Sequence, residues 1–174
     1  MSRRLTLLAT VLAVAVITHF AVVLAAPRVL TAIAANRISH KGALNNRWFY
    51  PPRATETSRE IVRPSPDLAY AACVFDLRDG PVRITVTPGV AYTSLSLYAP
   101  NTDATVINAS KPVDLVIARP GQTVPTGPWR VHRTSDRWGI ALQRRLAPTD
   151  ATFHDADRLR RLDRCERLLA PRSQ

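Results

Sequence analysis

Near its start the chain carries one long apolar run. Residues Leu5–Ala26 include no Lys, Arg, Asp or Glu, and arginines at 3, 4 and 28 flank them. As an α-helix rising about 1.5 Å per residue, this run spans about 33 Å, which matches the hydrocarbon core of a bilayer. We therefore predict a transmembrane anchor over residues 1–28 that is closed by Pro27 and Arg28.

The alternative interpretation is a cleaved signal peptide, because the start is basic and Ala25 and Ala26 are small. The apolar region of a cleavable signal usually covers only about 7–15 residues. Pro27 would also stand directly after a cut at Ala26. Length and proline together favour a retained anchor.

His19 is the ionisable side chain inside the apolar run. Ionisable residues within a membrane are candidates for helix pairing or proton transfer, and the alternative is a neutral imidazole bonded to a backbone carbonyl. Basic residues are nearly balanced on the two sides of the run, so their count does not set the orientation. A signal-anchor position predicts an N-terminus inside and a C-terminal domain outside the cytoplasm.

Residues 29–63 read as a connector. Val29–Ala35 stays apolar and extends the helix, after which Asn, Pro, Ser and Thr accumulate without a helical or strand period. The aromatic trio Trp48-Phe49-Tyr50 interrupts this stretch. It either packs on the following domain or sits among lipid headgroups, where aromatic side chains are enriched.

Residues 64–171 form the predicted body, because apolar side chains there recur every second position. Ala71, Cys73, Phe75 and Leu77 share one face of the first strand. Further alternating segments cover residues 82–86, 92–98, 113–118, 129–134 and 138–146, with turn signals such as Asp79-Gly80-Pro81 and Pro88-Gly89 between them. Short strands at this spacing predict a mainly β fold, an antiparallel β-sandwich or barrel.

The pattern changes near the end of the chain. Leu159, Leu162, Cys165 and Leu169 follow each other at steps of three or four, which predicts a C-terminal helix over residues 155–170 that stops at Pro171. Cys73 and Cys165 then both point inward. If the helix docks over the first strand, the two form a disulfide, which requires an oxidising compartment; the alternative is two separately buried thiols.

The strand over residues 92–98 offers a candidate binding face. Tyr92, Ser94, Ser96 and Tyr98 alternate with apolar residues and therefore share one side. Aromatic rings with hydroxyl groups on a flat sheet can stack on a sugar or dock a partner. The alternative is an ordinary solvated face or one covered by a second layer.

Charge and motifs narrow the function classes. The net charge of +11 suits nucleic acid or anionic lipid. The basic residues are scattered and form no groove-reading motif, so we expect no nucleic acid. We find no phosphate loop, nucleophile elbow or Cys-x-x-Cys, and expect no cofactor and no metal. Two weaker hypotheses remain: a metal site from His132 and His154 with Asp136 or Asp155, and an acid–base pair of Asp67 and Asp76.

Three segments resemble the opening of the domain of unknown function 1254 family. They are Pro66-Asp67-Leu68-Ala69-Tyr70, Cys73-Val74-Phe75-Asp76-Leu77 and Gly80-Pro81-Val82. Short membrane-anchored bacterial members are similar in the strand Ala72–Leu77 and in a histidine within the apolar segment, here His19. The resemblance covers roughly residues 63–171 and the anchor. It implies a jelly-roll-like β-sandwich, encoded beside or fused to a sister domain of unknown function.

Together these observations predict a single-pass protein of the bacterial inner membrane with its domain in the periplasm. We expect contacts with membrane lipid through the N-terminal helix, and action by interaction with an envelope partner such as a sister-domain protein. The alternatives are an envelope hydrolase or lyase with a pocket at one end of the sandwich, and a glycan- or lipid-binding module.

Overall fold

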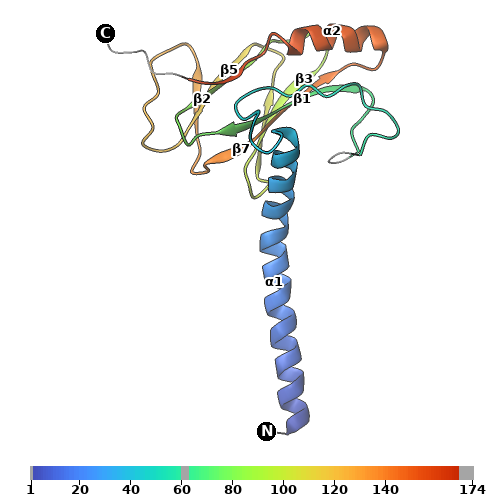
Figure 1. The fold of residues 1–174 in the computed structure, drawn as a ribbon, viewed down its shortest axis with the longest axis vertical. Helices are drawn as coiled ribbons and strands as arrows, with labels where there is room; N and C mark the ends of the chain where they lie inside the picture. Colours follow the sequence, from blue (N-terminus) through green and yellow to red (C-terminus); the bar gives the residue numbers. More distant parts are fainter. Residues whose placement is uncertain (1, 60–62, 169–174) are drawn as a thin grey trace.

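The computed structural model describes residues 2–59 and 63–168 and consists of a long helix that carries a β-rich domain (Figure 1). The helices are α1 (Arg3–Ile38) and α2 (Asp150–Arg160). The strands are β1 (Leu68–Asp76), β2 (Val82–Val86), β3 (Thr93–Tyr98), β4 (Ala104–Asn108), β5 (Val113–Ala118), β6 (Arg130–Arg133), β7 (Trp138–Leu146) and β8 (Cys165–Arg167).

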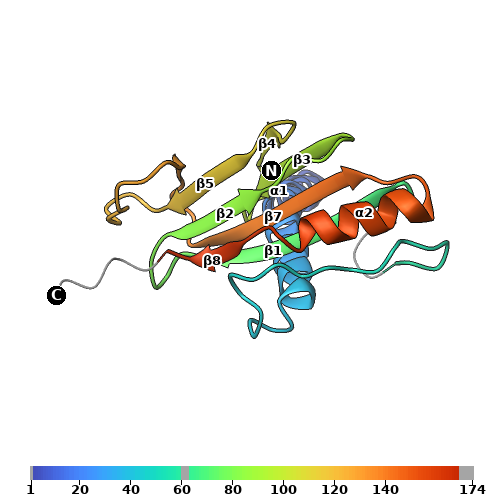
Figure 2. The same cartoon turned by 90° about the horizontal axis from the view of Figure 1, so that it is seen from above.

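The strands form two four-stranded sheets, which confirms the mainly β fold class with an N-terminal and a C-terminal helix. Sheet A has the order β1-β7-β3-β4 (Figure 2), and sheet B has the order β6-β5-β2-β8. All pairs are antiparallel except β5 with β6, which run parallel and make sheet B mixed. The 11-residue connection 119–129 carries the chain back to the start of β5, so β6 begins beside Leu115.

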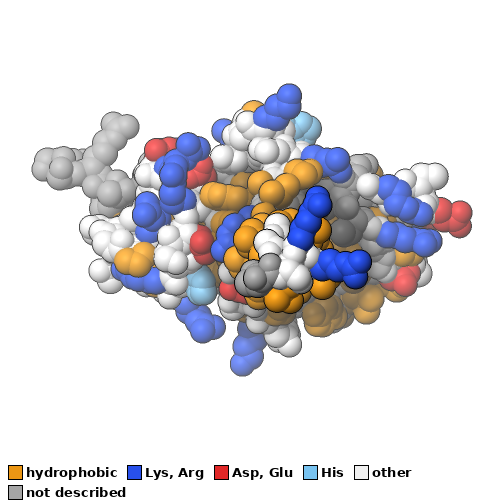
Figure 3. All heavy atoms as spheres, turned by 90° about the horizontal axis from the view of Figure 1, so that it is seen from below, with side chains coloured by type: hydrophobic (Ala, Val, Ile, Leu, Met, Phe, Trp, Pro, Cys, Tyr) orange, Lys and Arg blue, Asp and Glu red, His pale blue; other side chains and the backbone are white. Residues whose placement is uncertain are grey.

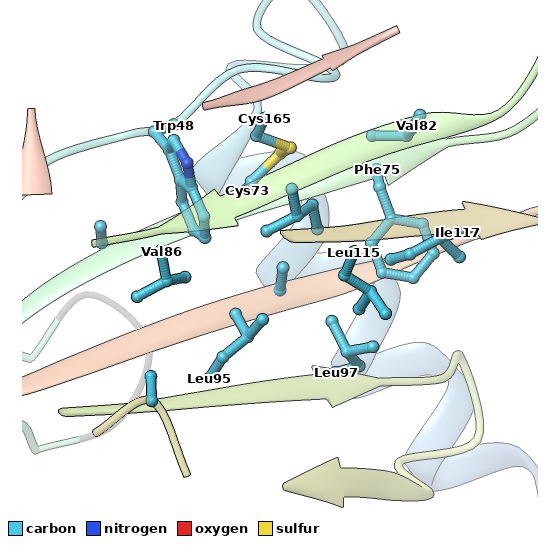
Figure 4. Packing of buried hydrophobic residues seen from close by; sticks show 14 of the residues in the cluster. Trp48, Cys73, Phe75, Val82, Val86, Leu95, Leu97, Leu115, Ile117 and Cys165 are labelled. Carbon is cyan, nitrogen blue, oxygen red and sulfur yellow. A yellow bond between two sulfur atoms is a disulfide. The ribbon is translucent and has the colours of Figure 1, made fainter. Parts of the chain in front are cut away.

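The core lies between the two sheets. Alternate residues of β1, β2, β3 and β5 point inward, as the period of two predicts. Cys73, Leu77, Val82, Ile84, Leu95 and Ile117 are each fully buried, and Figure 4 shows most of this cluster from close by. Trp48 joins the same cluster, so the aromatic trio packs on the domain rather than lying apart from it.

A disulfide between Cys73 of β1 and Cys165 of β8 crosses this core and links sheet A to sheet B. The Cα atoms are 6.6 Å apart, and the two cysteines are 92 positions apart in the sequence. Both are buried beside Trp48 and Phe75.

Helix α1 leaves the domain as an isolated rod (Figure 1). It is the one helix of the described residues that is long and apolar enough to cross a membrane, with a mean hydropathy of 2.6 over its most apolar 18 residues. Its large apolar side chains from Leu5 to Leu24 are exposed, and so are Val29, Leu30 and Ile33. Viewed along the rod, Lys and Arg side chains predominate among the charged groups around it (Figure 3).

Helix α1 continues through the predicted end of the span at Pro27 and Arg28 and ends at Ile38, so Pro27 lies inside it. Proline lacks an N–H, so the Val23 carbonyl loses its usual helical donor, while two side chains add bonds to neighbouring carbonyls of the same turns. The Arg28 Nη1 donates to the Leu24 carbonyl at 2.7 Å, and the Thr31 hydroxyl donates to the Pro27 carbonyl at 2.8 Å.

The last turns of α1 attach the rod to the outer face of sheet A. Ala35 and Ile38 are buried against Ala72, Val74 and Ile140. After Ser39 the chain reverses through three residues with positive φ, His40, Lys41 and Gly42. Phe49 then bridges to Ala72 of β1. The rod and the sandwich therefore share a small apolar core of their own.

The C-terminal helix is shorter and lies earlier than the predicted range 155–170. The Thr149 hydroxyl accepts a hydrogen bond from the Thr152 N–H, a capping box that starts α2 at Asp150. The helix ends at Arg160, Leu162 is 66% exposed, and Cys165 lies on β8 rather than on a helix. Leu169 and Pro171 lie outside the described residues.

The end of α2 is set by a buried polar cluster that the helical period does not reveal. Asp163 follows α2 and pairs with Arg145 of β7 at 2.7 Å, where both side chains are almost fully buried. The Thr87 N–H donates to Asp163 Oδ1, and Gln143 Nε2 donates to Asp163 Oδ2, each at 2.6 Å. Because Asp163 is buried in this cluster, the chain leaves the helix before it. Cys165 then pairs with Ile84 of β2.

We predict that Gly139→Ala destabilises the sandwich. A Cβ at Gly139 would lie 2.4 Å from Phe75 Cζ and 2.5 Å from the Tyr98 carbonyl oxygen, and that backbone oxygen has little freedom to move. Overpacking of this kind lowers the free energy of unfolding by about 1–3 kcal/mol, which urea denaturation would measure. Gly89→Ala is the matched control, since its nearest contact would be 3.4 Å; equal stability losses in both variants would contradict the prediction.

Candidate groove around Trp138

Trp138, the first residue of β7, lines three adjoining hollows at the end of the domain nearest α1. We call them together the Trp138 groove. Their volumes are about 200, 550 and 350 Å³. The first and second share Asp136, and the second and third share Asp76 and Arg78. The groove therefore runs from the helix to the end of the sandwich.

The part of the groove farthest from the helix lies between the two sheets. Its walls come from β1, β3, β4, β6 and β7 and from the β3–β4 and β6–β7 turns. The lining residues are Phe75, Leu97, Tyr98, Ala99, Asp103, Thr105, His132, Thr134, Asp136 and Trp138. Aromatic surface and polar groups meet here, as they do in ligand-binding hollows.

The part nearest the helix is formed by α1 and the reversal that follows it. It is lined by Ala32, Ala35, Asn36, Ser39, Lys41, Gly42, Asn45, Val74, Asp76, Arg78 and Trp138. The middle part adds Pro100, Ser135, Asp136 and Arg137 from the β3–β4 and β6–β7 turns. Helix α1 and the sandwich thus build one continuous surface.

Asp76 is the best-positioned charge in the groove. Its carboxylate accepts hydrogen bonds from Arg78 Nε at 2.8 Å and Arg78 Nη2 at 2.6 Å, and its backbone N–H donates to the Asn46 side chain at 2.7 Å. Burial raises the pKa of Asp76, but the hydrogen bonds from Arg78 outweigh it and the net pKa is lowered. Asp76 is therefore a fixed anion rather than a proton donor near neutral pH.

The other acidic groups of the groove are also held by neighbours. The Thr134 hydroxyl donates to Asp136 Oδ2 at 3.2 Å, and Asn101 Nδ2 donates to Asp103 Oδ2 at 2.7 Å. The Tyr98 hydroxyl accepts from Arg144 Nη2 at 2.8 Å. Each of these carboxylates already accepts a hydrogen bond from a neighbouring side chain. Such groups suit the recognition of a ligand better than the transfer of a proton to a ligand.

Comparison with known protein families finds a match over most of the β-rich domain. The family described as "Protein of unknown function (DUF1254)" covers residues 44–166, more than half of the chain. This chain belongs to the DUF1254 family. The match begins at Leu44, so it includes Trp48, which the structure places in the core. No curated protein matches the chain.

Among solved structures, the VPA0106 protein from Vibrio parahaemolyticus shares the fold of this DUF1254 protein. The TM-score is 0.56 at 13% sequence identity, with 83% of this chain and 39% of that chain covered. A putative uncharacterised protein from Burkholderia cenocepacia aligns with a TM-score of 0.44 at 13% identity, over 67% of this chain and 35% of that one. The chain therefore spans less than half the length of these structures.

The predicted binding face of Tyr92, Ser94, Ser96 and Tyr98 is only partly open in the DUF1254 domain. Ser94 and Ser96 are buried, Tyr98 is half-buried, and Tyr92 alone is exposed. Arg144 of the neighbouring strand β7 lies opposite Ser94 and donates to the Ser96 hydroxyl at 3.0 Å as well as to Tyr98. A long arginine from the adjacent strand fills the space above the small serines.

The predicted acidic and histidine sites are separated by the fold. Asp67 and Asp76 lie at opposite ends of β1, about 30 Å apart along an extended strand, so they form no pair. His132 and Asp136 both line the far part of the groove, whereas His154 and Asp155 belong to α2. Over residues 2–59 and 63–168, no three His, Cys, Asp or Glu side chains come together as metal ligands.

His19 lies on the exposed surface of α1, with its ring edge-on to Phe20 at 5.6 Å between centroids. Its role in helix pairing or proton transfer stays a prediction.

The lowered pKa of Asp76 predicts a specific pH dependence. A carboxyl whose folded pKa lies below its unfolded value of about 3.9 stabilises the fold above that pH and loses this contribution as the pH falls through the folded pKa. We expect Asp76→Asn to lower the free energy of unfolding at neutral pH, and the difference from wild type to shrink below about pH 4. Urea denaturation at both pH values measures this; a difference that stays constant would contradict it.

Sequence reasoning missed Trp138 and Arg137 as site residues. The signal was present, because a large aromatic residue follows the polar turn Thr134-Ser135-Asp136-Arg137 directly. What it could not show is that α1 returns to the same end of the sandwich, since only the three-dimensional path brings Ala35 beside β7.

Proposed function

We propose that this protein is a single-pass membrane protein of the bacterial envelope, whose DUF1254 domain is held on the outer face of the inner membrane and acts by binding an envelope partner. One observation carries the anchoring. Helix α1 exposes large apolar side chains along its length from Leu5 to Ile33. In water this surface would cost about 25 cal/mol for each Å² left unburied, whereas lipid removes that cost.

The disulfide supports the periplasmic side. Such bonds persist in the oxidising periplasm and are rare in the cytosol. The bond joins β1 to β8 inside the core, so it belongs to the folded domain rather than to an exposed tail. An N-terminus inside and a domain outside agree with it.

The free edge of β4 is the surface that we propose for the partner. β4 ends sheet A and is largely exposed, with Val106 63% exposed. An unpaired strand edge can accept a strand from another chain. The VPA0106 structure is more than twice as long as the part that this chain matches, which supports a separate protein, carrying a sister domain, as the partner.

The topology is tested by fusing alkaline phosphatase to the C-terminus in a bacterial host. Phosphatase folds to its active form only outside the cytoplasm, so we expect an active fusion. The proposed orientation would be contradicted if the phosphatase fusion is inactive and a reporter that works only in the cytoplasm gives a signal at the same position.

The partner surface is tested with a photo-crosslinking residue at Val106 of β4. The matched control is Val131 of β6, an exposed valine on the edge strand of the other sheet. We expect a cross-linked protein with a sister domain from position 106 and not from 131. Equal products from both positions, or none from 106 in membranes that contain the sister protein, would contradict this part of the proposal.

A further inference from the structure

The Trp138 groove opens at the level where the exposed apolar surface of α1 ends. Val29, Leu30 and Ile33 are exposed, and Ala32 is the first residue that lines the groove. From Ala26 to Ala32 the helix rises about 9 Å, close to the thickness of one headgroup layer, which is roughly 5–8 Å. No polar stretch of helix separates the lipid-facing surface from the domain.

Two cations in the groove form no ion pair with a described residue, although one of them, Arg137, attracts the Asp76 carboxylate from a longer distance and helps to lower its pKa. Arg78 is paired with Asp76. Lys41 and Arg137 are exposed and, in the described part of the chain, form no ion pair or side-chain hydrogen bond. The helix-side and middle parts of the groove contain one carboxylate besides Asp76. It belongs to Asp136 and accepts a hydrogen bond from the Thr134 hydroxyl. Three cations and two carboxylates leave the helix-side and middle parts of the groove with one net positive charge.

Trp138 adds a second feature of a headgroup site. Its side chain is half-buried against the apolar contact between α1 and sheet A, and it lines all three parts of the groove. Indole rings favour the boundary between hydrocarbon and water. The groove thus offers an interfacial aromatic surface next to unpaired cations.

We propose that the Trp138 groove binds the phosphate headgroup of an anionic phospholipid from the bilayer that holds α1, with Lys41 and Arg137 contacting the phosphate. This inference rests on the proposed anchoring. A bound headgroup would fix the domain against the membrane surface, which sets the height at which β4 presents its edge to a partner.

The experiment uses the full-length protein, purified in mild detergent and stripped of lipid. Native mass spectrometry measures its apparent Kd for phosphatidylglycerol and for phosphatidylcholine with matched acyl chains. The variants are Lys41→Gln, Arg137→Gln and the pair. Lys111→Gln is the matched control, because it also removes one positive charge. Lys111 lies in the β4–β5 turn, at the end of β3 and β4 that is opposite to Tyr98 and the groove.

Each groove variant is expected to weaken phosphatidylglycerol binding about fivefold and the pair about 25-fold, with phosphatidylcholine unchanged. Lys111→Gln should stay at the wild-type value. The proposal is overturned if the pair binds phosphatidylglycerol like wild type, if Lys111→Gln loses as much as Lys41→Gln, or if millimolar inorganic phosphate displaces the lipid, which would indicate a site for free phosphate.

Vesicle flotation of the same preparations separates the two proposals. Wild type and the paired variant should both float with vesicles, because α1 is unchanged in both. A wild-type protein that fails to float contradicts the anchoring itself. Flotation of both proteins with equal phosphatidylglycerol affinities contradicts only the headgroup site.

Discussion

Asp163→Asn is expected to lower the free energy of unfolding by about 3–5 kcal/mol, the usual cost of removing one partner from a buried ion pair. The Asp163 and Arg145 side chains are 0% and 3% exposed. Asp163 Oδ2 accepts from both Gln143 Nε2 and Arg145 Nη2. An amide nitrogen at that position would face two donors and leave the Arg145 charge buried without a counter-ion.

Urea denaturation of both proteins at neutral pH provides the measurement. Asp155→Asn is the matched control, because the Asp155–Arg158 pair on α2 is 65% and 80% exposed. Exposed pairs contribute about 0–1 kcal/mol. Should Asp163→Asn cost no more than Asp155→Asn, the buried cluster does not hold the C-terminal segment in place.

Reduction of the Cys73–Cys165 disulfide is expected to lower the free energy of unfolding by about 4–5 kcal/mol. The bond closes a loop of 92 residues, and the entropy lost by the unfolded chain grows with loop length. It also holds β8, a strand of only three residues, on sheet B beside β2. We therefore expect β8 and the end of α2 to loosen first.

The test compares urea denaturation of the wild-type protein with and without a thiol reductant, so that no side chain changes. The paired variant Cys73→Ala with Cys165→Ala should unfold at the same urea concentration in both conditions. A wild-type midpoint that ignores the reductant, with the bond shown to be broken, would exclude a stabilising role.

The strand period predicted most of the sandwich, because each strand buries one face and exposes or half-buries the other. β2 is the clearest case, with Val82, Ile84 and Val86 inward. β4 escaped prediction since its side chains are almost all exposed, so no buried period marks it. β8 was taken for helix because steps of three fit Leu159, Leu162 and Cys165, although the buried Asp163 ends the helix first.

The site was less accessible to sequence reasoning than the fold. Alternation correctly placed Ser94 and Ser96 on the outer face of sheet A, but it carried no information about Arg144 on β7, which covers them. The groove depends on α1, the reversal at Lys41 and the turn at Arg137, which lie about 100 residues apart and meet only through packing. Contacts of that kind have no local signature.

The most direct test of the account is alkaline carbonate extraction of membranes that contain the full-length protein. Carbonate releases proteins held on a membrane by charge, and it leaves in place those held by a helix in the hydrocarbon core. Because α1 exposes apolar side chains from Leu5 to Ile33, we predict that the protein stays in the membrane pellet. Release of the intact chain into the soluble fraction would contradict the anchor and with it the placement of the groove at the headgroups.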